Sequence, residues 1–170
     1  MCAAVCVSVV LGFYLSLIAS AGSLNVEEKS TVRAAIRELS AKGFKDEVFM
    51  LDHLAMFRAT DNWLNATVAK ENAYAATNFP FEIVTLYPDF FAYPRDDIER
   101  AAILLHEARH LLGEDEAQAY RYVWEHRREL GWIQEKYFDS AVWTNVRNQT
   151  RDAVPELFLC DADPRGDCDE

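Results

Sequence analysis

The first 25 residues of this chain contain no charged side chain. Their apolar run, about residues 3–21, is long for the core of a signal peptide and close to the minimum for a membrane span. The basic leader of a signal peptide is missing, but "Ala19-Ser20-Ala21" fits the small-residue rule for cleavage. Residues 1–22 are therefore predicted to be a signal peptide or a membrane anchor, with a buried N-terminal helix as a third interpretation.

Positive charge is also scarce. The chain has 17 Lys and Arg against 28 Asp and Glu, a formal net charge of −11 and a sequence pI near 4.8. It has no basic run and no Gly-rich phosphate loop. An acidic surface repels phosphate backbones, so nucleic acid is excluded as an expected partner. A membrane is expected only through the N-terminal segment, if that segment stays uncleaved.

Cysteine is rare, with four in 170 residues. Cys2 and Cys6 lie inside the apolar leader, where they act as small hydrophobes. Cys160 and Cys168 flank "DADPRGD", and their spacing is not that of a zinc-finger half-site. If the chain is exported, this pair predicts a short-loop disulfide, with two free thiols as the alternative. Export would make the protein secreted, periplasmic or anchored on the outer face of a membrane.

Residues 23–170 are long enough for one domain with its own core. Periodic apolar residues predict helices at 25–43, 46–62, 114–130 and 139–152, and His53 in the second of these is expected to be structural. The β-branched and aromatic run at 81–87 predicts a strand, with 73–77 as a possible partner. Asp96 and Gly113 bound a further helix at about 97–112. The expected fold is a helix-rich α+β domain with a small sheet whose edge strand is 81–87.

The helix at 97–112 carries His106-Glu107-x-x-His110, in a chain with only four histidines. This arrangement arises by chance in a chain of this composition at roughly 1%. At 3.6 residues per turn the two imidazoles share one face, where they can bind one Zn²⁺ from the same side. Glu107 points about 100° around the helix. It is expected near the open coordination position, where it can accept a proton from water and pass it to a leaving amine.

A third zinc ligand is expected just after this helix. Gly113 lets the chain turn, which can bring Glu116 back towards the histidines. Glu114 and Asp115 are competitors for the same role, and the three acids together can also be no more than a charged helix start.

Hydrolysis of a peptide bond at zinc also needs a hydrogen-bond donor that stabilises the oxyanion. Tyr120 and His126 are the candidates for this donor. The alternatives are packing for Tyr120 and solvent exposure for His126. Arg109, inside the motif, is expected to form an ion pair on the helix surface.

The string "HEARHLLGEDE" resembles the zinc helix of the zincin metallopeptidases. It is similar to the metzincin pattern H-E-x-x-H-x-x-G-x-x-H, with Glu116 in place of the third histidine. The order "NAYA", "EIVTLY", H-E-x-x-H, "EDEA" is similar to that of HtpX-like gluzincin peptidases. Both resemblances imply Glu116 as third ligand. No methionine follows residue 56, so the metzincin Met-turn is absent.

These observations predict a zinc-dependent metallopeptidase that hydrolyses peptide or protein substrates with one Zn²⁺. The alternative is a catalytically inactive, zincin-like exported domain that binds metal or a partner. A third interpretation is an exported structural domain with a chance motif. The oligomeric state stays open.

Overall fold

The fold was analysed in a computed structural model, which describes residues 2–64, 66, 73–79 and 81–159. The helices of four or more residues are α1 (Cys2–Ser20), α2 (Val26–Ala41), α3 (Lys45–Phe49), the π-helical turn η1 (Met50–Leu54), α4 (Pro88–Ala92), α5 (Asp97–Leu111), α6 (Glu116–Leu130), α7 (Gln134–Tyr137), α8 (Ala141–Ala153) and the 3₁₀ turn η3 (Pro155–Phe158). The strands are β1 (Met56–Arg58), β2 (Ala75–Asn78) and β3 (Ile83–Leu86).

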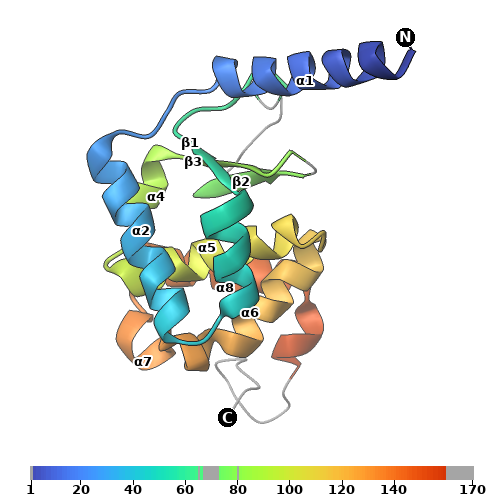
Figure 1. Ribbon diagram of the computed structural model, residues 1–170. Coiled ribbons are helices and arrows are strands. Elements are labelled where there is room, and N and C mark those ends of the chain that lie inside the picture. Colours follow the sequence, from blue (N-terminus) through green and yellow to red (C-terminus); the bar gives the residue numbers. More distant parts are fainter. Residues whose placement is uncertain (1, 65, 67–72, 80, 160–170) are drawn as a thin grey trace.

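The predicted α+β fold is confirmed: many helices surround one small mixed sheet (Figure 1). The strand order is β1-β3-β2, with β1 parallel and β2 antiparallel to β3. The strands predicted at 73–77 and 81–87 are therefore present, at slightly shifted bounds. The predicted edge position of the second is wrong, because β3 lies in the centre and all four of its residues are buried. The two edge strands are β1 and β2.

The helix predicted at 46–62 is also wrong beyond residue 54. The chain leaves η1 at Ala55, which is extended, and Met56 donates a backbone hydrogen bond to the Glu82 carbonyl (2.7 Å). Leu51 is buried as expected, but Leu54 is 47% exposed. Residues 56–58 pair with β3 as strand β1. This tertiary pairing outweighs the helical spacing of the apolar residues in the segment.

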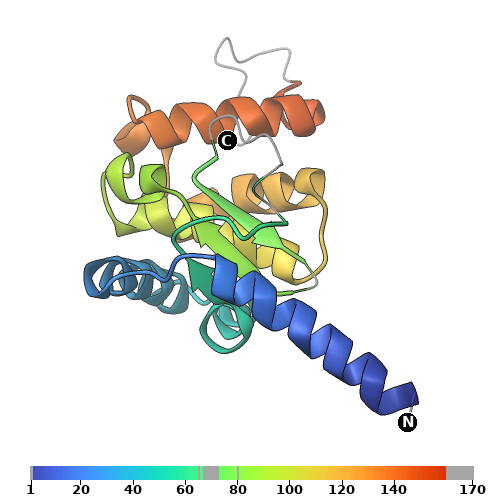
Figure 2. The same cartoon turned by 90° about the horizontal axis from the view of Figure 1, so that it is seen from above.

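Helix α1 extends beyond the rest of the molecule, on the side of the sheet away from α5 (Figures 1 and 2). Leu17 is fully buried and the Trp63 indole N–H donates to the Ser16 hydroxyl (3.2 Å), but Val9 and Val10 are more than 60% exposed. The interpretation of this segment as a buried helix is therefore wrong for most of α1. Among the residues that the structure describes, no helix combines the length and apolarity that crossing a membrane requires. Cleavage or anchoring of residues 1–22 stays a prediction.

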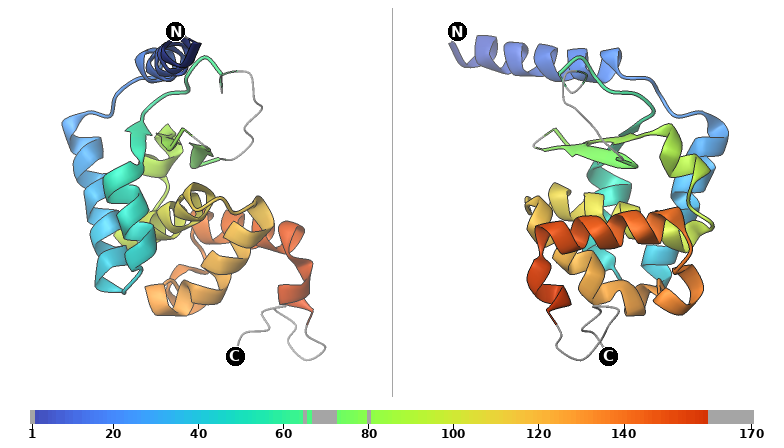
Figure 3. Two further views of the ribbon diagram at one scale, coloured as in Figure 1. Left: turned by 45° about the vertical axis from the view of Figure 1, so that its right-hand side comes forward. Right: turned by 180° about the vertical axis from the view of Figure 1, so that it is seen from behind.

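Helix α5 runs through the centre of the fold (Figure 3). On one side it packs against α2 and α3, and on the other against α6, which in turn packs against α8. Its buried apolar residues are Ala101, Ala102, Ile103, Leu104, Leu105, Ala108 and Leu111. A helix covered on both sides is held rigidly, so side chains that it presents to a third side are fixed in direction.

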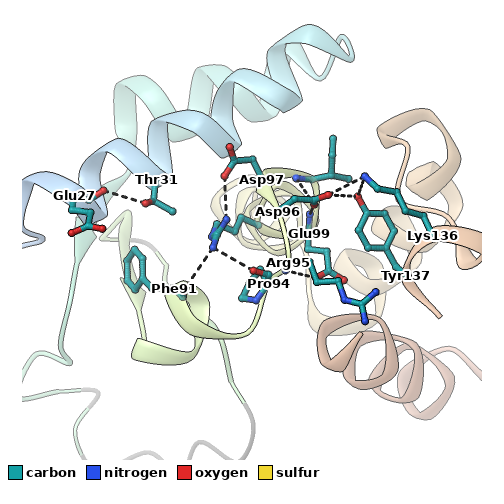
Figure 4. Close-up of polar contacts among 12 residues, drawn as sticks. Glu27, Thr31, Phe91, Pro94, Arg95, Asp96, Asp97, Glu99, Lys136 and Tyr137 are labelled. Atoms are coloured by element: carbon teal, nitrogen blue, oxygen red, sulfur yellow. Dashed lines mark hydrogen bonds and ion pairs between the residues drawn. The ribbon is translucent and has the colours of Figure 1, made fainter. Parts of the chain in front are cut away.

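The start of α5 is fixed by Asp96, as predicted (Figure 4). Its carboxylate accepts hydrogen bonds from the Ile98 and Glu99 N–H groups, and also from Lys136 and Tyr137. Burial acts to raise the pKa of Asp96, but these donors outweigh it and hold the pKa below its usual value. Gly113, in the left-handed region with φ +87°, follows the end of the helix.

Helix α6 begins at Glu116, two residues later than predicted, because Asp115 is its cap. The Asp115 carboxylate accepts from the Gln118 N–H (2.9 Å), and the Gln118 side chain accepts from the Asp115 N–H (3.0 Å). The predicted end at Gly131 (φ +81°) is confirmed. The predicted helix at 139–152 is α8, one or two residues later at each end.

Replacing Asp96 with Ala should lower the free energy of unfolding by about 1–2 kcal/mol, because two N–H groups at the start of α5 lose their acceptor. Asp97→Ala is the control: Asp97 pairs with the part-buried Arg100 (3.1 Å) and caps no backbone N–H among the described residues, so it should change stability by about 0.5 kcal/mol. Urea unfolding of the three proteins measures the difference. The effect of Asp96 should fade as the pH falls through its lowered folded-state pKa. Equal losses in both variants would contradict the capping role.

Candidate metal centre

The structure brings His106, His110 and Glu116 together in an arrangement that could hold a metal ion, and these three residues are called the metal group below. The two Nε2 atoms of the histidines lie 3.0 Å apart. One carboxylate oxygen of Glu116 is 3.2 Å from His106 Nε2, and the other is 3.5 Å from His110 Nε2. A tetrahedral zinc with ligands at about 2.0–2.1 Å separates neighbouring ligand atoms by about 3.3 Å. Each of these pairs lies near that spacing, and one ligand atom from each residue lies within 4.8 Å of the other two, so the three residues could hold one zinc ion.

The two competing acids are engaged elsewhere. Both oxygens of the Glu114 carboxylate are bound by the guanidinium of Arg109. Asp115 caps α6. Glu116 is the remaining acid of the three, and its side chain is 69% exposed, whereas those of His106 and His110 are 13% and 16% exposed. The metal group is thus buried on the histidine side and open to solvent on the glutamate side.

Arg109 was expected on the helix surface, and this part of the prediction is wrong. Its side chain is only 16% exposed, and it pairs with Glu47, a buried residue of α3 (2.7 Å), as well as with Glu114. The sequence does not reveal this contact, because Glu47 lies 62 residues before Arg109.

Each histidine presents Nε2 to the shared point. His110 Nδ1 lies 2.9 Å from the Glu114 carbonyl, so this nitrogen donates the hydrogen bond and leaves Nε2 free as a ligand. His106 Nδ1 is buried without a hydrogen-bond partner among the described residues, and its ring packs against that of Tyr120 at 4.3 Å between centroids. The polar contacts of His106 are therefore all on the Nε2 side.

The electrostatic field at this point favours positive charge. Burial acts to lower the pKa of His110, but Glu116, the Glu114 carbonyl and Glu107 outweigh it and raise the pKa to about 9. Hydrogen bonds from His106 and His110 hold the pKa of Glu116 far below its usual value. A field that retains a proton on a half-buried imidazole also favours a divalent cation in the proton's place. The donor set, two nitrogens and a carboxylate, suits zinc.

Glu107 lies next to the metal group but is not part of it. Its side chain is buried, with 4% exposure, and its Oε2 accepts a hydrogen bond from the Thr77 hydroxyl (2.7 Å) on β2. The sequence prediction missed Thr77. Strand 73–77 was expected, but which of its residues faces the zinc helix depends on a tertiary contact 30 residues apart.

A cavity of about 810 Å³ opens over these residues. Strand β2 and helix α5 form one part of its wall, and residues of α8 form another. Tyr120 lines it, as expected for a residue that acts in the site. His126 is not among the lining residues: its Nδ1 lies 2.8 Å from the Tyr122 carbonyl, and its ring contacts Phe44 and Tyr122. The geometry gives no support to the predicted catalytic role of His126.

The chain matches no protein-family model, no curated protein and no solved structure. The resemblance to zincins therefore stays a prediction that rests on the motif. Cys160 and Cys168, predicted to form a disulfide, lie outside the described residues.

The protein should bind one Zn²⁺, and Glu116→Ala should weaken this binding more than about tenfold, because the ion loses its only carboxylate ligand. Competition with a chelating dye measures the affinity. Glu125→Ala is the control, since Glu125 lies on the same helix and its ion pair within the described ranges is with Arg121 at 3.8 Å. A zinc affinity of the Glu116 variant equal to that of the native protein would contradict the assignment of Glu116 as third ligand.

Proposed function

We propose that this protein is a zinc-dependent peptidase in which His106, His110 and Glu116 hold the metal and Glu107 is the general base. One observation carries the proposal: His106, His110 and Glu116, whose ligand atoms lie close together, line the same cavity as the buried carboxylate of Glu107. A metal group alone would suit many binding proteins. A second carboxylate beside it, outside the ligand set, is what hydrolysis of a peptide bond requires.

Zinc bound at this group would act as a Lewis acid and supply a water whose pKa is near 7. The chain's own residues provide the proton transfer. Thr77 holds Glu107 Oε2 by a hydrogen bond, so the other carboxylate oxygen is available to accept a proton. Glu107 can then donate this proton to the leaving amine, because a buried carboxylate held in one orientation reaches both atoms without moving far.

The edge of β2 offers a place for an extended peptide. Tyr87 N–H donates to the Tyr74 carbonyl (3.0 Å), and the register pairs Ala76 with Thr85. Hydrogen-bonded positions alternate along an antiparallel pair, so the backbone groups of Ala75 and Thr77 point away from β3. No described strand pairs with this outer edge. A substrate that adds here as a strand would run past Glu107, which Thr77 contacts.

Tyr120 is the proposed oxyanion donor. Burial, together with the charges of Glu116 and Glu107, raises the pKa of its hydroxyl well above the usual value, so it stays protonated at neutral pH. This hydroxyl has no hydrogen-bond partner within the described part of the chain. A donor without a partner, on a residue that lines the cavity and packs against His106, suits the negative oxygen that develops during hydrolysis.

The substitution Glu107→Gln should leave zinc affinity near the native value and lower peptide cleavage by about 10²–10⁴-fold, because the amide cannot accept the proton. Cleavage of an unfolded test protein measures activity, and dye competition measures zinc. Glu129→Gln, on an exposed residue of α6, is the control for the same chemical change. Equal cleavage by native protein and the Glu107 variant would contradict the proposal. Zinc binding without cleavage by either would favour the alternative, an inactive zincin-like domain that binds metal or a partner.

Tyr120→Phe should keep the ring packed on His106 and remove only the hydroxyl. We expect kcat to fall by about 10²-fold or more, with KM and zinc affinity nearly unchanged. Tyr93→Phe, at an exposed ring outside the cavity, is the control. An unchanged kcat in the Tyr120 variant would remove this residue from the mechanism.

A further inference from the structure

We infer that Arg109, which occupies a free position of the H-E-x-x-H motif, is a positioning residue for the metal group. Its guanidinium fixes Glu114, and through Glu114 it sets both the orientation of His110 and the path of the chain to Glu116. The inference rests on the proposed function, because it concerns the same metal group. It adds a residue that neither ligates the metal nor touches the reacting atoms.

The side chains of Arg109 and Glu114 meet at two points. Arg109 Nε donates to Glu114 Oε2 (2.8 Å), and Nη2 donates to Oε1. A guanidinium that binds both oxygens of one carboxylate fixes its plane as well as its distance. The Glu114 side chain is therefore held in one orientation relative to the last turn of α5.

The backbone of Glu114 is tied to the same turn. Its N–H donates to the Arg109 carbonyl (3.1 Å), and its own carbonyl accepts from His110 Nδ1 (2.9 Å). Gly113 makes this reversal possible by its positive φ. Glu114 is thus bound through its amide, its carbonyl and its carboxylate, and only Asp115 separates it from Glu116. A shift of Glu114 would move the acceptor of one ligand and the anchor of another.

Arg109 is in turn fixed from the other side. Its Nη1 donates to Glu47 Oε1 (2.7 Å), and Glu47 is only 3% exposed. The Tyr122 ring of α6 lies against the guanidinium, at 3.9 Å from Cζ to the ring centroid. Lysine cannot reproduce this arrangement, because a single ammonium has neither the planar fork nor the flat face.

Two roles are possible for such a network, and they differ in what they predict. A purely structural ion pair would add to the stability of the fold and leave the metal affinity of the folded protein unchanged. A positioning residue changes metal affinity, since partners that orient metal ligands typically contribute about 10–100-fold. Its effect should also disappear once Glu114, the residue through which it acts, is removed.

The test compares zinc affinity in native protein, Arg109→Lys, Glu114→Ala and the double variant, by competition with a chelating dye. We expect each single variant to bind zinc about 10–100-fold more weakly, and the double variant to bind no more weakly than the weaker single one. The visible absorption of Co²⁺-loaded protein should change in the same variants, because it reports ligand geometry. Arg121→Lys, at an exposed ion pair with Glu156, is the matched control. Urea unfolding of each metal-free protein shows that the compared chains are folded.

The outcomes separate this inference from the proposed function. Zinc binding by native protein with equal affinity in Arg109→Lys and Glu114→Ala would overturn the positioning role and leave the metal group intact. Losses that simply add in the double variant would overturn it too, because they would show independent effects. Should Arg109→Lys fail to fold, an unchanged zinc affinity in Glu114→Ala would still overturn the inference, because Arg109 is inferred to act through the Glu114 carboxylate, which is partly exposed and can be removed without loss of the fold. Absence of zinc binding by the native protein would instead overturn the proposed function itself.

Discussion

The reversal of the chain after α5 is the constraint on which the rest of the site depends. A helix can place two histidines on one face by itself, but a third ligand must come from another segment. Gly113, with a backbone conformation that other residues adopt at a cost, turns the chain sharply enough for α6 to start beside the histidines. Helix α5 carries the two histidines and the first residue of α6 carries the glutamate, so residues 106–116 contain the whole candidate group.

A second feature of this acidic chain is that three of its glutamate side chains are buried. Glu47, Glu99 and Glu107 are each less than 5% exposed, and each has a donor: Arg109, Ser140 and Thr77 respectively. A charged group removed from water is destabilising unless it is paired. The three partners come from different elements of the structure. Each acid therefore ties α3 or α5 to a distant segment, and this restricts how the central helix can sit.

Features that depend on neighbouring residues could be predicted from the sequence, whereas several that depend on contacts between distant residues could not. The bounds of α5, the cap at Asp96 and the turn at Gly113 depend on residues within a few positions of one another, and these predictions were confirmed. The strand β1 was taken for helix, because its place is set by pairing with β3, 27 residues along at Met56↔Ile83. The contacts of Thr77 with Glu107 and of Glu47 with Arg109 were not predicted for the same reason. His126 was a candidate oxyanion donor because the sequence does not show that it lies outside the cavity lining.

The contact between Glu47 and Arg109 also has a bearing on how the protein is made. The chain emerges from synthesis with α3 first, and 62 residues separate the two partners. Arg109 can pair with Glu47 only once the chain has been made beyond residue 109, and Tyr122 of α6, whose ring lies against the guanidinium, is made later still. A chain that stops before residue 109 lacks the buried ion pair, and one that stops before residue 122 lacks the aromatic ring that lies against the guanidinium.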